Sequence, residues 1–534
     1  MLDQIGSCVG VVFKYLKVEE VVLLKFLNKS FGNLVSNYAG VVLRLKQDRL
    51  EKFSKVKNLC LLVLHSNKPL QLDLSTYVLS KNQVTTLLKS IPLNSELKLL
   101  IEESTFVSLG NLTLKITSMK LLLDQEYIEC GKLLSYTLTN GNLKSVAIYV
   151  RSNRWYDENT WEEFLSFLRK ALVNSSVECL EMPPFLDLEK VKSQYFPISF
   201  LEEEPSFIVC KCIEAIKLSN VTYLDLSNNR LPKESIEVLL ECNLVSLKLV
   251  NCYLGNQVTC ILEKLKHSNL QKLFLGHNTL TKHSAEMLCE VLPNSNLTTI
   301  SLRRTRINWG NSLFESLSLS RVKSIDLSLN SVQIRGVSEF SLLKIRCLNL
   351  SNNALDSEAA RTIGHLLGNS SLVSLDLSQN QIEDLTSICK NLNELQCLDL
   401  SQNFMSDFCA ESLAQALPSS KLTELFLEFN EFTDKGAELL LNSACKLKSL
   451  DLGHNKLTSK STKALASAIP KTQIAYLSLR GNELNEEVLK GFLSSLPFSR
   501  IRALKVNLAR QKTYVVSQLK QLCYQLEIDL PFNH

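Results

Sequence analysis

Residue types that carry out catalysis are present in this chain, but they are not grouped in the patterns that catalysis needs. The seven histidines lie far apart in the sequence. The chain has no glycine-rich phosphate loop, no His-Glu-x-x-His zinc motif and no Gly-x-Ser-x-Gly nucleophile motif. Cys210 and Cys212 form the only close cysteine pair, whereas a structural zinc site needs four ligands. We therefore expect a protein that is not an enzyme and that uses no metal or other cofactor.

Aromatic and charged residues form two groups that could bind a partner. Aromatic residues and Arg dominate the binding energy of protein interfaces, so exposed residues of these types mark candidate contact surfaces. The first group lies next to Trp309 and contains Lys272, Phe274, His277, Arg303, Arg304 and Arg306. The second group contains Glu424, Phe426, Glu428, Phe429, His454, Tyr476 and Arg480. We expect both groups to form partner-binding patches.

A repeated sequence pattern positions both groups. From Val221 to Leu231, apolar residues occupy positions 1, 4, 6 and 11, and Asn229 occupies position 9. Copies of this pattern begin at residues 221, 244, 270, 297, 322, 345, 372, 395, 422, 447 and 474, and a degenerate copy begins at residue 501. The ninth positions of successive copies are 23 to 27 residues apart. A recurring period of this length is typical of repeat proteins.

Each position of the pattern has a physical role. Side chains alternate along a strand, so positions 4 and 6 point into the core while positions 3, 5 and 7 are exposed. Asn at position 9 is suited to bind the backbone of the turn after the strand, and these bonds would recur from copy to copy. Apolar residues then recur at helical spacing, as in residues 357–367. Each copy therefore predicts a strand, a turn and a helix that stack on the next copy.

Asp at position 5 and Ser at position 7 recur along the copies. The pairs are Asp225 and Ser227, Asp326 and Ser328, Asp376 and Ser378, and Asp399 and Ser401. We interpret this ladder mainly as a solvated, hydrogen-bonded strand edge, because a recurring polar face needs no ligand to be stable.

The pattern Leu-x-x-Leu-x-Leu-x-x-Asn-x-Leu followed by a helix resembles the ribonuclease-inhibitor-like class of leucine-rich repeats. The resemblance implies an α/β fold: a curved, horseshoe-shaped leucine-rich-repeat solenoid with parallel strands on the concave face and helices on the convex face. We expect regular repeats over residues 217–515 and a C-terminal cap over 516–534. Residues 51–216 are expected to form degenerate repeats, with an inserted loop near 181–207, where four prolines and an acidic run break the pattern.

Residues 1–50 contain no repeat and are predicted to form a small helical segment. Residues 12–34 resemble an F-box through the apolar start, the Leu-rich middle and the Asn-Lys-Ser-Phe ending. The matching residues are Phe13, Tyr15, Leu16, Leu24, Phe31 and Leu34. This resemblance implies docking of residues 2–45 to the adaptor of a cullin-RING ubiquitin ligase. The alternative is a helical cap that covers the open end of the solenoid.

Composition and charge indicate which partners and which cellular location to expect. Hydrophobic residues make up 45% of the chain and charged residues 21%, so a large core can form. The net charge of +5 over 534 residues does not point to nucleic-acid or membrane partners. There is no secretory signal, no apolar run of membrane-spanning length, and the 16 cysteines are scattered. We expect an intracellular protein, either cytoplasmic or nuclear, with reduced cysteines.

The sequence thus favours a non-enzymatic interaction scaffold that binds a partner protein through the concave face. A sharper version makes the chain the substrate receptor of a cullin-RING ubiquitin ligase. The alternatives are a regulator of an enzyme, either a ribonuclease-inhibitor-like inhibitor or a small-GTPase activator, and a structural subunit of a large intracellular assembly.

Overall fold

The chain folds into two compact units, Met1–Cys252 and Tyr253–His534. The computed structural model describes residues 42–44, 71–78, 84–85, 88, 96–102, 106–109, 116–123, 127–141, 143–150, 158–173, 175–181, 213–231, 233–334, 344–392, 394–484, 486–507, 513–526 and 528. The six matching residues of the F-box-like pattern, Phe13, Tyr15, Leu16, Leu24, Phe31 and Leu34, lie outside the described residues. Residues 182–212, which include nearly all of the expected inserted loop, also lie outside them.

The first unit contains a parallel sheet in which each strand pairs with the next one in sequence. Its strands are β1 (Val42–Arg44), β2 (Gln71–Val78), β3 (Glu96–Glu102), β4 (Ser118–Leu123), β5 (Ser145–Val150), β6 (Cys179–Glu181), β7 (Tyr223–Asp225) and β8 (Ser246–Lys248). Its helices are α7 (Tyr127–Asn140), α8 (Glu158–Leu172) and α11 (Lys233–Leu239). Val146 and Ile148 of β5 are buried, as expected for inward strand positions.

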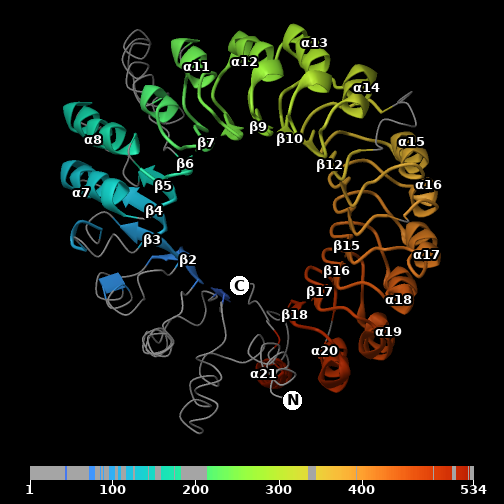
Figure 1. The fold of residues 1–534 in the computed structure, drawn as a ribbon. Coiled ribbons are helices and arrows are strands. Elements are labelled where there is room, and N and C mark those ends of the chain that lie inside the picture. Colours follow the sequence, from blue (N-terminus) through green and yellow to red (C-terminus); the bar gives the residue numbers. More distant parts are fainter. Residues whose placement is uncertain are drawn as a thin grey trace, which may run out of the picture. The chain divides into compact units, whose positions relative to one another are not determined.

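The second unit repeats one strand and one helix along its length, and all neighbouring strands are parallel. The strands are β9 (Lys272–Phe274), β10 (Thr299–Ser301), β11 (Ser324–Asp326), β12 (Cys347–Asn349), β13 (Ser374–Asp376), β14 (Cys397–Asp399), β15 (Glu424–Phe426), β16 (Ser449–Asp451), β17 (Tyr476–Ser478) and β18 (Ala503–Lys505). Within this unit the strands line the inner side of the curve and the helices the outer side (Figure 1). We call the solvent side of β9–β18, at repeat positions 3, 5 and 7, the concave face.

The helices of the second unit vary in length. They are α12 (Val258–Lys264), α13 (Lys282–Val291), α14 (Asn311–Leu319), α15 (Ser357–Leu367), α16 (Thr386–Cys389), α17 (Asp407–Ala416), α18 (Asp434–Ser443), α19 (Thr462–Ala468), α20 (Glu486–Ser495) and α21 (Thr513–Gln525). Short 3-10 turns flank some of them: η4 (Gly255–Gln257), η5 (Leu265–His267), η6 (Leu292–Asn294), η7 (Ser459–Ser461), η8 (Ile469–Lys471) and η9 (Leu496–Phe498). The four-residue helix α16 lies in one of the 23-residue periods, between Asn380 and Asn403 (403 − 380 = 23), whereas α11 in the equally short period from Asn229 to Cys252 has seven residues. A 27-residue repeat has about one helical turn more.

The core follows the predicted pattern. Leu375 and Leu377, at positions 4 and 6 of the copy that begins at residue 372, have no exposed surface. The equivalent residues of the other copies from 221 to 501 are also buried, and so are all twelve residues at position 1. The prediction of inward positions 4 and 6 is confirmed. Stacked copies thus share one continuous apolar spine, which is why each repeat needs its neighbours for stability.

Asparagines at position 9 link the repeats through their backbones. The Asn380 side chain donates to the carbonyls of Leu350 and Leu377, at 3.1 and 2.9 Å, and accepts from the amides of Asn353 and Leu355, both at 3.0 Å. Similar bonds recur at Asn353, Asn403, Asn430, Asn455 and Asn482. The predicted asparagine ladder is therefore confirmed, and it satisfies buried backbone groups that no strand or helix pairs.

Position 8 of the pattern has a left-handed backbone in every copy from 221 to 474, although only Gly481 among these residues is glycine. Its amide donates to the next repeat: Phe429 N to the Gly453 carbonyl, at 2.9 Å, and His454 N to the Arg480 carbonyl, at 2.6 Å. A left-handed conformation costs a side-chain-bearing residue about 1 kcal/mol or more, and these inter-repeat bonds offset that cost. The side chains at position 8 consequently stand at the edge of the concave face.

Candidate interaction surface

The second predicted group lies on three neighbouring repeats around β15, β16 and β17. Glu424, Phe426 and Glu428 occupy positions 3, 5 and 7 of one repeat, and Phe429 follows at position 8. The next repeat provides His454 at position 8, and the third provides Tyr476 and Arg480 at positions 3 and 7. Parallel pairing in register brings these positions side by side.

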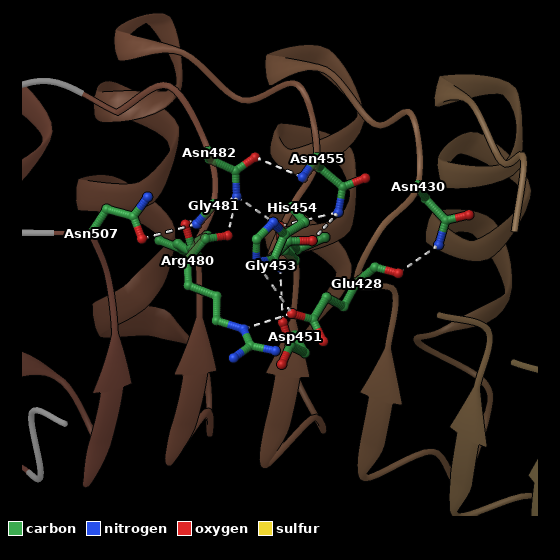
Figure 2. Close-up of polar contacts among 12 residues, drawn as sticks. Glu428, Asn430, Asp451, Gly453, His454, Asn455, Arg480, Gly481, Asn482 and Asn507 are labelled. Carbon is green, nitrogen blue, oxygen red and sulfur yellow. Dashed lines mark hydrogen bonds and ion pairs between the residues drawn. The ribbon is translucent and has the colours of Figure 1, made fainter. Parts of the chain in front are cut away.

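An ion pair crosses one whole repeat on this surface. Arg480 Nε donates to Glu428 Oε1 at 2.6 Å, although the two residues are 52 positions apart (Figure 2). The bond to Glu428 raises the pKa of the Arg480 guanidinium. Gly453 occupies position 7 of the repeat between them, and because it has no side chain, nothing at this position separates Arg480 from Glu428. A Cβ there would lie 3.1 Å from both Arg480 Cγ and Glu428 Oε1.

Two aromatic rings and a glycine form a stack beside this ion pair. The rings of Phe429 and His454 are stacked with centroids 4.0 Å apart and an interplanar angle of 7°. On the other side of the imidazole lies Gly481, where any Cβ would overlap the His454 ring. His454 Nε2 is 3.9 Å from Glu428 Oε1, the oxygen that also accepts from Arg480. The imidazole is thus held between Phe429 and Gly481 with one edge toward the carboxylate.

Tyr476 joins the same arrangement through Asp451, a residue that was not among the predicted group. The Tyr476 hydroxyl donates to Asp451 Oδ2 at 3.4 Å, and Lys505 Nζ lies 5.2 Å from the centre of the Tyr476 ring. Asp451 is buried and also accepts from the Gly453 amide at 2.8 Å. The recurrence of Asp at position 5 was the sequence signal that could have placed Asp451 in the site.

The first predicted group lies on β9 and in the turns after β9 and β10. Lys272, Phe274, His277 and Arg303 are half-buried, while Arg304 and Arg306 are exposed. Arg303 donates to Ser328 Oγ of the next repeat at 2.9 Å. Burial, and to a smaller extent Arg304 and Arg303, lower the pKa of His277. Trp309 beside this group is a core residue, only 2% exposed, whose Nε1 donates to Thr305.

The recurring Asp and Ser residues bond as predicted but are less solvated than predicted. Ser378 Oγ donates to Asp376 Oδ1 at 2.7 Å, and Asp225 and Asp326 hold Ser227 and Ser328 in the same way. Asp399 accepts from the Ser401 amide at 2.9 Å. Burial raises the pKa of Asp399, and the nearby Asp376 and Asp451 carboxylates raise it further. The ladder is therefore also a source of negative charge on the concave face.

Three findings on the described residues bear on metal ligands, membrane spans and reactive thiols. Over those residues, no three His, Cys, Asp or Glu side chains come together in a way that could hold a metal ion. None of the helices described above is both long and apolar enough to cross a membrane. Desolvation raises the pKa of Cys252 and Cys389 to about 12, so these thiols behave as core side chains and not as nucleophiles.

Sequence comparisons identify the repeats directly. Models of the leucine-rich repeat match residues 220–242, 368–385, 419–441 and 443–466. No curated protein matches the sequence significantly.

Two solved structures resemble this fold. A leucine-rich-repeat protein of Leptospira interrogans is 17% identical, with a TM-score of 0.39, over 79% of this chain and 91% of that one. An internalin of Listeria monocytogenes is 17% identical, with a TM-score of 0.36, over 69% of this chain and 88% of that one. The matched repeat models, together with the recurring strand, turn and helix, show that the chain contains leucine-rich repeats and has the α/β solenoid fold that such repeats build.

Proposed function

We propose that the chain is a non-enzymatic scaffold that binds a partner protein through the concave face, centred on the second group. Leucine-rich-repeat proteins generally act as protein-interaction modules, and their strands offer an extended binding surface. The observation that carries this proposal is the bridge from Arg480 to Glu428 beside the stack of Phe429 and His454. These contacts fix aromatic and charged side chains before a partner arrives, which lowers the entropy that binding costs.

The chemistry of the second group favours a protein partner over a small molecule. Phe429 is 44% exposed, although it makes a ring stack, and Glu424 on β15 is also exposed. Large aromatic side chains flanked by charge are enriched where proteins meet. The first group is less organised for binding: its exposed residues are two arginines, whose like charges repel each other.

Affinity purification of the full chain from its native cell tests this proposal. Phe426→Ala/Tyr476→Ala should lose a co-purifying protein that wild type retains, because it removes two aromatic side chains from the centre of the surface. Phe498→Ala, at an exposed phenylalanine of η9 away from the concave face, is the control and should retain that protein. Phe274→Ala/Arg304→Ala reports on the first group in the same way. If neither double variant loses a partner, the concave face is not the binding surface.

The ligase role is a finer proposal, supported by the F-box-like sequence of residues 12–34. In that case the N-terminal segment binds the cullin-RING adaptor while the repeats hold the substrate. Purified adaptor should then bind the full chain, and Leu16→Asp/Leu24→Asp should abolish that binding while leaving the partner of the concave face bound. An intact chain that does not bind the adaptor would exclude the ligase role and leave the scaffold proposal standing.

A further inference from the structure

The middle of the concave face carries only negative charge. Positions 3, 5 and 7 of the six repeats from β11 to β16 are all described, and none of them is Lys, Arg or His. Six of these positions are carboxylates: Asp326, Asp376, Asp399, Glu424, Glu428 and Asp451. Arg480, from the following repeat, reaches Glu428. The Arg480 charge also acts on Asp451, whereas no Lys or Arg at these strand positions of the six repeats neighbours Asp376 or Asp399.

Strand register places the charges close together. Asp376 on β13 lies beside Asp399 on β14, and the next partners in register are Phe426 on β15 and Asp451 on β16. Neighbouring strands are about 4.8 Å apart, and like charges directly opposite each other destabilise a sheet. The raised pKa of Asp399 has this repulsion among its causes. A cation above this row would relieve the repulsion, whereas an anionic ligand would increase it.

An unpaired hydroxyl at the end of the row is an independent indication of a missing polar group. Ser478, on β17, is the register partner of Asp451 and lies on the same face. Its side chain is fully buried, and its Oγ has no hydrogen-bond partner among the described residues. Buried hydroxyls are nearly always paired. Ser478 is therefore a polar group, in register with Asp451, that no described residue satisfies.

Exposed phenylalanines lie in and next to the turns that follow β14 and β15. Phe404, Phe408 and Phe429 are 55%, 59% and 44% exposed and lie in two neighbouring repeats. Phe404 is in the turn after β14 and Phe429 is in the turn after β15, whereas Phe408 is the second residue of α17. The Glu431 amide donates to the Met405 carbonyl at 2.9 Å, which joins the two turns. Exposed apolar groups of this size mark interaction sites when they cluster.

From these observations we propose that the partner presents a basic, extended segment to the concave face. Its Lys or Arg side chains lie over Asp376 and Asp399, and an apolar side chain of the same segment packs on Phe404 and Phe429. This inference rests on the proposed function, because it names the chemistry of the partner at that surface. Nucleic acids and acidic segments are excluded by the same charge.

Binding of designed peptides to the full chain tests the inference. The probe is a fluorescent peptide of alternating Lys and Ser with a central Leu-Leu pair. Wild type should bind it, more weakly as salt rises, and should not bind the peptide in which Glu replaces Lys. Replacing the Leu pair by Ser should weaken binding. Failure of wild type to bind the Lys peptide, or equal binding of the Glu peptide, would overturn the inference.

Variants that replace a carboxylate by an amide show where on the chain the Lys peptide binds. Asp376→Asn/Asp399→Asn should weaken binding of the Lys peptide about five- to tenfold. The fold should tolerate this change, because Asn349 occupies the same position in its own repeat and accepts from Ser351 Oγ at 2.8 Å. The control Glu411→Gln/Glu438→Gln removes two charges from exposed positions of α17 and α18, and should bind like wild type. Equal loss in both double variants would mean a diffuse charge effect and would contradict a site on the strands.

A separate variant tests the proposed contact between the peptide's Leu pair and the exposed phenylalanines. Phe404→Ser/Phe429→Ser should weaken binding of the Lys peptide that carries the Leu pair, but not of the peptide in which Ser replaces that pair. Phe498→Ser should change the binding of neither peptide. Equal effects on both peptides would refute the apolar contact. If the peptides do not bind while Phe426→Ala/Tyr476→Ala still loses its co-purifying protein, the basic segment is wrong and the proposed function survives.

Discussion

At the scale of single residues, position 9 shows how a side chain replaces backbone pairing. Asn380 is 5% exposed and bonds both to its own turn and to the preceding repeat. Where Asn is missing, other side chains make part of these bonds: Thr305 donates to the Leu302 carbonyl at 3.0 Å, and Cys252 Sγ approaches the Leu226 carbonyl at 3.2 Å. Position 9 thus requires a small polar side chain that can bond the turn.

We predict that Asn380→Ala lowers the free energy of unfolding by about 2 to 4 kcal/mol, because buried amides and carbonyls of two repeats lose their partner. The midpoint of urea denaturation measures this loss. Gln381→Ala, at the exposed next position, is the control and should change the midpoint little. Equal midpoints for the two variants would show that the ladder does not stabilise the stack.

Asp399 illustrates a residue whose charge opposes folding. Its pKa in the folded chain lies above the ordinary value of 3.8, mainly because of burial. An acid whose pKa is raised in the folded chain lowers stability at pH values above that pKa. The loss fades as the pH falls and is gone below the ordinary value of the unfolded chain. This sign is opposite to that of a carboxylate stabilised by an ion pair.

Asp399→Asn should therefore stabilise the protein at neutral pH, by up to about 1 kcal/mol. The gain should vanish in acid, where wild-type Asp399 is protonated and its repulsion from Asp376 and Asp451 is absent. Thermal unfolding of both proteins at neutral and acidic pH measures the difference, and Glu411→Gln is the exposed control. A variant that is less stable at neutral pH would show that the Asp399 charge is favourable.

At the scale of elements, the helices adapt to the repeat length. The 23-residue interval from Asn380 to Asn403 contains α16, the four residues Thr386–Cys389. This short helix packs closely on α15, where Gly364 faces the backbone of Ser387 and Ile388. A Cβ on Gly364 would be 2.6 Å from Ile388 N, so only glycine permits this approach.

Gly364→Ala should displace α16 and lower the free energy of unfolding by about 1 to 3 kcal/mol through overpacking, although alanine favours helices. Chemical denaturation gives the value. Gly310→Ala is a matched control because nothing lies within 4 Å of the Cβ that it would add. If both variants are equally stable, α15 and α16 are not in close contact.

The elements that the sequence predicts are those that depend on a short, repeated pattern. The strands, the inward leucines and the asparagine ladder follow from side-chain alternation and from the period, and they are confirmed. The contact of Arg480 with Glu428 could not be predicted in the same way, because it joins residues two repeats apart. It depends on the space above Gly453, which is a property of three stacked repeats and not of the pattern.

At the scale of the whole molecule, charge is arranged in blocks along the concave face of the second unit. Lys272 and Arg303 lie before the acidic row, and Arg480 and Lys505 lie after it. A partner that follows the strands meets basic, acidic and basic surface in turn, which would fix its direction and register. The predicted division between degenerate and regular repeats near 216–217, and the ribonuclease-inhibitor-like class, stay predictions from sequence.

The central claim is that the strands, and not the helices, of the second unit contact the partner. A photo-crosslinking amino acid placed at Glu424 on β15, and in a separate variant at Glu411 on α17, tests it in the native cell, since both positions are exposed. The account predicts a discrete crosslinked protein from position 424 and none from position 411. A crosslink from position 411 alone, or the absence of any crosslink from position 424, would contradict it.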